Sequence, residues 1–258
     1  MLAIDAVGVA KAYLDDAFRP IPVIKDLSFS VADGEFVSIV GPSGCGKSTM
    51  FNMIAGLLEP TAGTISVLGE SVTGPSPHLG YMMQKDLLLP WRTVAENIEL
   101  GLEVKGQTRR ERRAVSLDYL SRFNMSEFAD AMPETLSGGM RQRVALMRTL
   151  AMEPEVVLLD EPFSALDYQT RLVLEDEILS ILTDLGKSAI LITHDIGEAV
   201  AMSDRVLVVA KRPTYVKADI PVGLVREYGT TTQARAASEY PAVFSQIWDL
   251  LDVQMSRR

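Results

Sequence analysis

The chain contains the segment Gly41-Pro42-Ser43-Gly44-Cys45-Gly46-Lys47-Ser48-Thr49, which follows the apolar run 35–40 and precedes the helical pattern 50–56. The spacing G-x-x-x-x-G-K-S between a strand and a helix is typical of a phosphate-binding loop. Its glycines allow backbone N–H groups to converge on an anion, and the helix N-terminus adds partial positive charge. Lys47 would reach the β- and γ-phosphates, and Ser48 would bind Mg²⁺. The alternative is an ordinary glycine-rich turn, but the flanking strand and helix favour a nucleotide site at residues 41–49.

Length and charge limit the class of protein. The 258 residues are 47% hydrophobic, which suits one large α/β domain or one domain with an inserted subdomain. Lys and Arg number 25 against 34 Asp and Glu, the net charge is −9, and no long basic run occurs. This balance argues against general binding of nucleic acid, and we expect no nucleic-acid partner.

Cysteine content and hydropathy indicate a cytoplasmic setting. Cys45 is the one cysteine of the sequence, so it cannot form an internal disulfide, and a reducing compartment is the simplest setting. The first residues, 1–5, lack the basic and apolar regions of an ordinary signal peptide. No stretch approaches 18 uninterrupted apolar residues, so we expect that the chain does not itself cross a membrane.

The first part of the chain has the pattern of a sheet. Residues 2–10 and 22–40 alternate apolar and polar positions, which predicts short strands, with Tyr13 in the turn between them. An exposed aromatic residue at this turn could stack on adenine, although a lone Tyr in a β region is also consistent with simple packing. After the glycine loop, the pattern predicts a helix at 47–57 and strands at 64–69 and 79–84, the last ending at Gln84.

A helical region interrupts the sheet pattern. Residues 93–152 read as helical, and we predict an inserted helical subdomain at about 87–152. It closes with Ser137-Gly138-Gly139, a cap and two glycines that open a helix to about Met152. Strands and helices then alternate, which predicts an α/β fold with a parallel sheet. These elements are a buried strand at 155–161, a helix at 168–185, a strand at 188–193, a helix after His194-Asp195 and a strand at 205–209.

Polar residues at the ends of predicted strands are candidates for chemistry. Asp160 and Glu161 end a buried apolar strand, where Asp160 suits a metal ion and Glu161 suits a water molecule; a surface turn is the alternative. Gln84 could contribute an oxygen to Mg²⁺ or to water. His194 could donate to a γ-phosphate oxygen, but a helix-capping or core imidazole fits its position equally well.

The segment Ser137-Gly138-Gly139 is a second helix N-terminus suited to an anion, but it has no lysine and lies far from the glycine loop in sequence. The chain thus has two helix N-termini suited to an anion but only one of them carries a lysine, Lys47. A head-to-tail pair of two copies would explain this. In such a pair the Ser137 segment of one copy covers the phosphate loop of the other. This shared site is a hypothesis.

Together these motifs resemble the ATP-binding subunit of ABC transporters. By this resemblance, Tyr13 is the adenine-stacking aromatic residue, residues 41–49 are the Walker A loop, and Gln84 is the Q-loop residue. Residues 136–143 are similar to the family signature. The match extends over about residues 4–210 and implies a P-loop NTPase (RecA-like) core with an N-terminal antiparallel β region and the inserted helical subdomain.

The resemblance also gives roles to the later motifs. Val156 to Asp160 correspond to Walker B, Glu161 to the catalytic glutamate and His194 to the switch histidine. Ser164-Ala165-Leu166-Asp167 resembles the D-loop, which places Asp167 at the nucleotide. The implied domain covers residues 1–226, and residues 227–258 form a tail with one helix near 240–253.

The finer likeness is to importers of nitrate, sulfonates and taurine. It rests on residues 87–94, 165–171 and 212–222. Two positions depart from the usual pattern. Gly197 stands where an acidic residue is common, and Tyr168 replaces a small residue. The resemblance implies ATP hydrolysis with Mg²⁺, a head-to-tail dimer, membrane permease subunits contacted through residues 84–97, and a periplasmic binding protein as an indirect partner. It implies a peripheral location on the cytoplasmic face of the inner membrane.

Two other functions compete with this one. A soluble ABC-type ATPase of translation or DNA repair usually has two cassettes or a long coiled-coil insertion, and neither pattern is visible in this sequence. A small-molecule P-loop kinase would need a substrate-binding lid in place of residues 136–143. Phosphate release separates an ATPase from a kinase, and a membrane partner separates a transporter subunit from a soluble ATPase.

Overall fold

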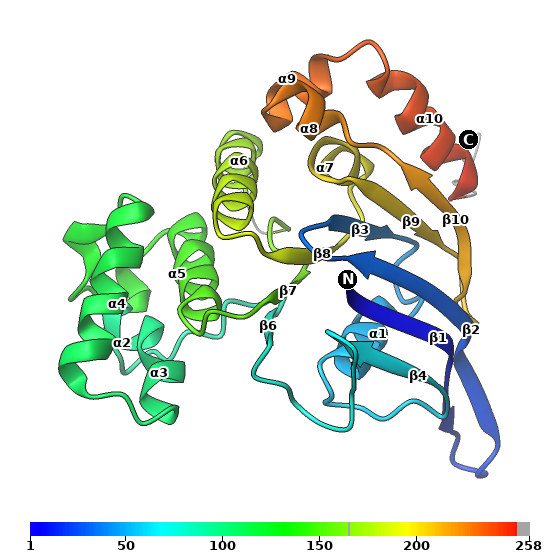
Figure 1. Ribbon diagram of the computed structural model, residues 1–258, viewed down its shortest axis with the longest axis horizontal. Coiled ribbons are helices and arrows are strands. Elements are labelled where there is room, and N and C mark those ends of the chain that lie inside the picture. Colours follow the sequence, from blue (N-terminus) through cyan, green and yellow to red (C-terminus); the bar gives the residue numbers. More distant parts are fainter. Residues whose placement is uncertain (165, 252–258) are drawn as a thin grey trace.

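Two sheets form the framework of the computed structural model, which describes residues 1–164 and 166–251 (Figure 1). The first is antiparallel, in the order β2-β1-β4-β5, and the second has the order β10-β9-β3-β8-β7-β6. The strands of the first are β1 (Leu2–Leu14), β2 (Pro20–Ala32), β4 (Ala62–Val67) and β5 (Glu70–Ser71). The strands of the second are β3 (Phe36–Val40), β6 (Leu79–Met82), β7 (Val156–Asp160), β8 (Ser188–Thr193), β9 (Arg205–Val209) and β10 (Val216–Pro221).

The second sheet is parallel from β6 to β9, and β10 is antiparallel to β9. Every residue of β3, β7 and β8 is buried, as the continuous apolar run 156–159 predicts for central strands covered on both faces. Successive residues of β7 serve opposite faces: Val157 and Leu159 belong to one apolar cluster, Val156 and Leu158 to another. The α/β prediction and the N-terminal antiparallel region are confirmed.

The N-terminal strands are longer than the sequence pattern suggested. The prediction of short strands at 2–10 and 22–40 is wrong in its bounds, because β1 extends to Leu14 and the second run divides into β2 and β3. Register shifts interrupt the β1–β2 pairing at several points, including between Ala6 and Val9. Such bulges break the strict alternation from which strand ends are read.

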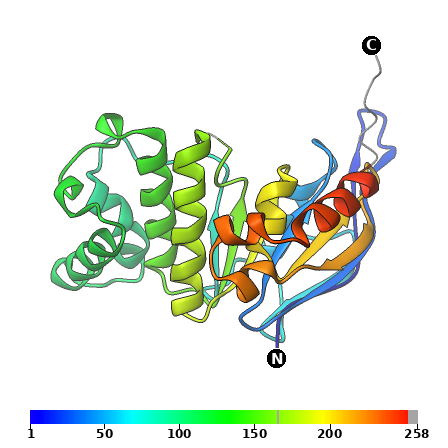
Figure 2. The same ribbon diagram turned by 90° about the horizontal axis from the view of Figure 1, so that it is seen from above.

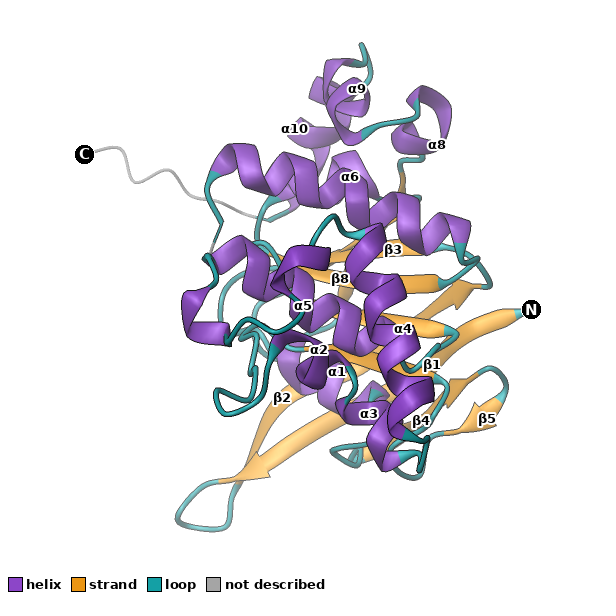
Figure 3. Cartoon of the chain, turned by 90° about the vertical axis from the view of Figure 1, so that its left-hand side faces the viewer, coloured by secondary structure: helices purple, strands orange, loops and turns teal. Residues whose placement is uncertain are grey.

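A group of helices lies at one side of the parallel sheet, where Figure 3 shows them in front of the strands. They are α2 (Val94–Ile98), α3 (Leu100–Val104), α4 (Arg109–Arg122) and α5 (Gly138–Leu150), with short 3₁₀ turns at Ser126–Phe128 and Pro133–Thr135. Capping boxes begin α2 at Thr93 with Glu96 and α4 at Thr108 with Glu111. The helical region predicted at about 87–152 therefore contains two helices of five residues, α2 and α3, and two longer ones, α4 and α5; a side chain caps the start of α2, α4 and α5.

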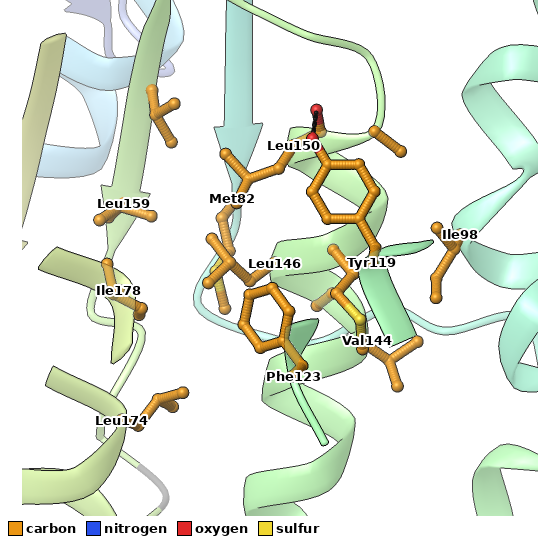
Figure 4. Close-up of a cluster of buried hydrophobic side chains, with 14 of the residues drawn as sticks. Met82, Ile98, Tyr119, Phe123, Val144, Leu146, Leu150, Leu159, Leu174 and Ile178 are labelled. Carbon is orange, nitrogen blue, oxygen red and sulfur yellow. Dashed lines mark hydrogen bonds between the residues drawn. The ribbon is translucent and has the colours of Figure 1, made fainter. Parts of the chain in front are cut away.

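The helical region shares its core with the parallel sheet (Figure 4). Tyr119 of α4 and Phe123, which follows α4, lie beside Leu146 of α5, and the same cluster reaches Leu159 of β7. The Tyr119 hydroxyl donates to the Leu150 carbonyl at 2.9 Å, which satisfies the one polar atom that this aromatic ring buries. Consequently α5 is fixed to the sheet while its N-terminus remains at the surface.

The remaining helices cover the parallel sheet and continue into the C-terminal region. They are α1 (Lys47–Ile54), α6 (Tyr168–Asp184), α7 (Ile196–Met202), α8 (Leu224–Tyr228), α9 (Thr231–Ala236) and α10 (Tyr240–Leu250). The prediction of one helix in the tail is wrong, because α9 precedes α10 and α8 spans the predicted boundary at 227. Helices of five and six residues carry too few turns for an apolar period to be visible. None of the helices in residues 1–164 and 166–251 is long and apolar enough to span a membrane.

Candidate functional site

Three sequence motifs meet at one edge of the parallel sheet. The glycine loop follows β3, Asp160 ends β7 with Glu161 directly after it, and His194 follows β8. These strands are neighbours in the order β3-β8-β7 and run parallel, so their carboxyl ends lie side by side. Open α/β sheets bind ligands at this edge.

The glycine loop has the backbone of an anion site. Gly44 and Gly46 have φ of 72° and 117°, a region that favours glycine. Gly46 caps α1 without a side-chain hydrogen bond, so the first N–H groups of this helix keep their capacity for an anion. The Lys47 amine is directed back into the loop, where it donates to the carbonyls of Gly41 at 2.7 Å and Pro42 at 3.2 Å. Residues 41–49 therefore combine a basic group with converging donors.

Glu161 lies at the centre of a polar cluster. Its Oε2 accepts from Gln84 Nε2 at 2.9 Å and lies 3.4 Å from His194 Nδ1. Glu161 has φ of 47°, an uncommon left-handed conformation for a non-glycine residue, and its N–H donates to the Ile192 carbonyl at 2.8 Å. Strained backbone of this kind clusters at functional sites. The structure thus brings Gln84, Glu161 and His194 together from three separate strand ends.

Asp160 is the buried member of the pair, with 6% of its surface exposed. Burial raises the pKa of Asp160 above its ordinary value, although hydrogen bonds from Ser48 and Tyr81 lower it. The Tyr81 hydroxyl donates to Asp160 Oδ2 at 3.3 Å, and burial raises the pKa of Tyr81. The hydroxyl of Ser48 and the carboxylate of Asp160 are hard oxygen ligands, and their contact fits a Mg²⁺ site. Tyr81 was missed by the sequence reasoning, since one tyrosine in a strand carries no signal of its partner.

Ser137, Gly138, Gly139 and Asp167 gather at two neighbouring helix N-termini. Ser137 caps α5 by accepting from the Met140 N–H at 3.3 Å, and Asp167 caps α6 by accepting from the Thr170 N–H at 3.1 Å. A Cβ on Gly139 would lie 2.8 Å from Thr170 Cγ2, so the two helix starts are in close contact. No hydrogen bond or ion pair joins residues 137–139 to the glycine loop within the described part of the chain. Ala165 of the predicted D-loop lies outside the described residues.

Tyr13 differs from its predicted setting. It lies inside β1, paired with Ile21 of β2, and the prediction of a turn position is wrong. Its side chain is 43% exposed, and the Lys11 amine lies 5.6 Å from the centre of its ring. An exposed ring face is what stacking on adenine requires, and that role stays a prediction.

A partly buried polar network next to His194 in sequence was not predicted; Thr193 and Glu198 are its buried members. Arg171 Nη1 of α6 lies 2.9 Å from Asp195 Oδ2 and 3.2 Å from Glu198 Oε1. Thr193, at the end of β8, donates its hydroxyl to Glu198 Oε2 at 2.5 Å. Burial raises the pKa of Glu198 to about 7; the Thr193 hydroxyl and Arg171 lower it, and nearby Asp195 raises it further. These residues flank His194 on both sides in sequence, and no motif spacing identifies such a network.

Glu198→Gln is expected to flatten the pH dependence of stability. The folded protein holds the Glu198 proton up to a pKa of about 7, whereas the unfolded chain releases it near 4.5. The stability from this group is therefore full below pH 4.5 and is lost as pH rises through 7. Urea unfolding between about pH 4.5 and pH 8 should show the variant losing up to about 3 kcal/mol less than wild type. Glu227→Gln, at an exposed position, is the control, and equal pH slopes in all three proteins would contradict the assignment.

Comparisons with known proteins agree with this geometry. A family model described as ABC transporter matches residues 24–164. A Brucella abortus biovar 1 (strain 9-941) protein described as ATP-binding is 46% identical over 222 residues, 86% of this chain and 85% of that protein. The taurine import ATP-binding protein TauB of Yersinia pestis bv. Antiqua (strain Antiqua) is 39% identical over 237 residues, 92% of this chain and 93% of TauB. A dimeric post-hydrolysis structure of the ATP-binding cassette MJ0796, bound to ADP and Pi, has a TM-score of 0.76 at 32% identity and covers 85% of this chain and 98% of its own.

Proposed function

Because the chain belongs to the ABC transporter family as an ATP-binding cassette, we propose that it drives a bacterial importer of a small anion such as nitrate, a sulfonate or taurine. The chain is an ATPase of this family. The observation that carries the proposal is the cluster of Gln84, Glu161 and His194 beside the glycine loop. Likeness to TauB supports the class of cargo.

Each residue of the site would have a separate role in ATP hydrolysis. Lys47 would leave the loop carbonyls and contact the β- and γ-phosphates, and Tyr13 would stack on adenine. Glu161 would accept a proton from the attacking water, while Gln84 and His194 orient this carboxylate and the γ-phosphate. Ser48 and Asp160, with Gln84, would hold Mg²⁺, which would neutralise charge on the phosphate oxygens.

A second copy of the chain would complete the site. Ser137, Gly138 and Gly139 of the partner would bind the γ-phosphate through the start of α5, and Asp167 would lie at the same interface. The absence of a lysine from residues 136–139 fits a segment that covers a phosphate already held by Lys47. The dimeric neighbour structure supports this arrangement.

The loop after Gln84 connects the catalytic cluster to a surface suited to a permease. Asp86 Oδ2 lies 3.1 Å from Arg141 Nε of α5, and Arg148 of α5 donates to the carbonyls of Asp86 and Leu87. Trp91, which follows in the same loop before α2, is 71% exposed. Movement of a membrane subunit against this loop would therefore shift the helix that carries Ser137. The chain would sit peripherally on the cytoplasmic face of the membrane, with a periplasmic binding protein as an indirect partner.

Co-purification tests the importer assignment. The chain should be retained on a tagged permease encoded beside it, and the complex should release phosphate from ATP faster when the loaded binding protein is added. Trp91→Ala should weaken retention, since it removes a large exposed apolar group from the contact loop. Phe18→Ala is the matched control, because Phe18 is 83% exposed on the β1–β2 hairpin. A chain that hydrolyses ATP but never associates with the permease would favour the soluble ATPase instead.

A further inference from the structure

The C-terminal helices lie against the helix that begins directly after His194-Asp195. Figures 1 and 2 show α8, α9 and α10 beside α7, and both α9 and α10 contact it. Ala234 of α9 and Ile247 of α10 share one buried cluster with Ile196 of α7 and Val40 of β3. Val40 immediately precedes the glycine loop and Ile196 follows Asp195. The buried cluster of the C-terminal helices therefore includes residues next to two segments of the candidate site, the glycine loop and the segment around His194.

A buried ion pair fixes α9 to α6. Arg235 Nη1 lies 2.7 Å from Glu175 Oε2, and Arg235 Nη2 donates to Glu175 Oε1 at 3.0 Å. The Glu175 side chain is 0% exposed and that of Arg235 is 18% exposed. The Thr231 N–H, at the start of α9, donates to Asp176 Oδ1 at 2.7 Å. One charge-assisted hydrogen bond and a second close contact between the charged groups, with the carboxylate fully buried, hold the orientation of two helices more strictly than a surface pair does.

One helical turn before Glu175, Arg171 holds the segment around His194. Besides its ion pairs to Asp195 and Glu198, its Nη2 donates to the Leu166 carbonyl at 3.4 Å. Leu166 precedes Asp167, the cap of α6. Arg171 therefore connects two segments to α6: the one after His194, through Asp195 and Glu198, and the one before Asp167, through Leu166. The ion pair of Arg235 holds α9 against the same helix.

The tail also accounts for the unusual Gly197. A Cβ at this position would lie 3.1 Å from the Tyr240 hydroxyl at the start of α10 and 3.0 Å from Asp195 Oδ1. Both distances are shorter than ordinary van der Waals contact. A small residue in the first turn of α7 thus allows the tail to approach closely, one turn from His194.

We propose that Arg235 is a positioning residue for the His194 segment during ATP hydrolysis. It would act through its ion pair with Glu175. The close packing of α10 against Gly197 would contribute to the same positioning. This inference rests on the proposed function. Loss of the pair would let α6 and α7 shift relative to β7, which would move His194 away from Glu161. The phosphate loop follows β3, which is paired with β8 on one side and β9 on the other, so the affinity for ATP would change little when the Arg235–Glu175 pair is lost.

The experiment compares Arg235→Met with the double variant Arg235→Met/Glu175→Gln in the 258-residue chain. The single variant leaves the Glu175 carboxylate buried without its partner, which destabilises the fold. The double variant removes both charges, so its melting temperature should return close to the wild-type value. In both variants kcat for phosphate release should fall about tenfold, with KM for ATP within about twofold of wild type. Arg235→Lys should recover part of kcat.

The double variant separates positioning from stability. A double variant with wild-type melting temperature and wild-type kcat would overturn the inference, since the pair would then serve only stability. Equal loss of kcat in Arg235→Lys and Arg235→Met would also overturn it. If the wild-type chain itself released no phosphate, the proposed function would fail instead, and the two failures are thereby distinguished.

Discussion

Lys47→Ala is expected to reduce ATP hydrolysis by about 10²- to 10³-fold, the usual loss when one donor to a developing phosphate charge is removed. The Lys47 amine is 2.7 Å from the Gly41 carbonyl, so it is close to where a bound phosphate would lie. Alanine removes the positive charge, so nucleotide binding should become weak. It should not be lost completely, because the glycine loop keeps its backbone N–H donors. Phosphate release and titration with a fluorescent ATP analogue measure both effects.

Lys187→Ala is the matched control for this substitution. Lys187 precedes β8 at the amino edge of the sheet, opposite the candidate site. Its replacement should leave hydrolysis unchanged. Near-wild-type hydrolysis by Lys47→Ala would contradict the assignment of residues 41–49 as the nucleotide site.

Glu161→Gln is expected to retain ATP binding while turnover falls by about 10²- to 10⁴-fold, the range for loss of a general base. Glutamine has the same shape, and its side-chain oxygen can still accept from Gln84 Nε2, which lies 2.9 Å from Glu161 Oε2. It cannot accept a proton from water, so the chemical step stops with the nucleotide in place. Binding isotherms and single-turnover phosphate release distinguish these steps.

Glu155→Gln provides the control on the same strand. Glu155 lies just before β7, at the end opposite Glu161, and is paired with His78 at 3.1 Å. Its variant should turn over like wild type. Equal turnover in Glu161→Gln and wild type would remove Glu161 from the mechanism.

Sequence reasoning succeeded where the chemistry requires a fixed local pattern. The glycine loop and the apolar run before Asp160 each specify an element and its ligand-facing end, and parallel pairing then brings those ends together. The grouping of Gln84 with Glu161 and His194 follows from the strand order β8-β7-β6. Strand order is a tertiary property that local patterns do not carry, and the family resemblance implied the type of core without an order of its strands.

Features that depend on distant packing could not be predicted. Tyr13 was placed in a turn because bulges obscure the alternation of β1, and α9 is too short to show a period. The contacts of Arg171 with Asp195, and of Arg235 with Glu175, join residues far apart in sequence. Charged residues in helices are normally solvent-exposed, so only the structure identifies the buried ones.

We propose that ATP is held between two copies of the chain. Sedimentation of Glu161→Gln with and without Mg·ATP, over a range of protein concentrations, tests it most directly. We predict a shift from one chain to two that requires ATP and is abolished by adding Ser137→Glu, which would place a carboxylate against the partner's phosphates. Glu161→Gln that binds ATP yet remains a single chain at every concentration would contradict the shared site.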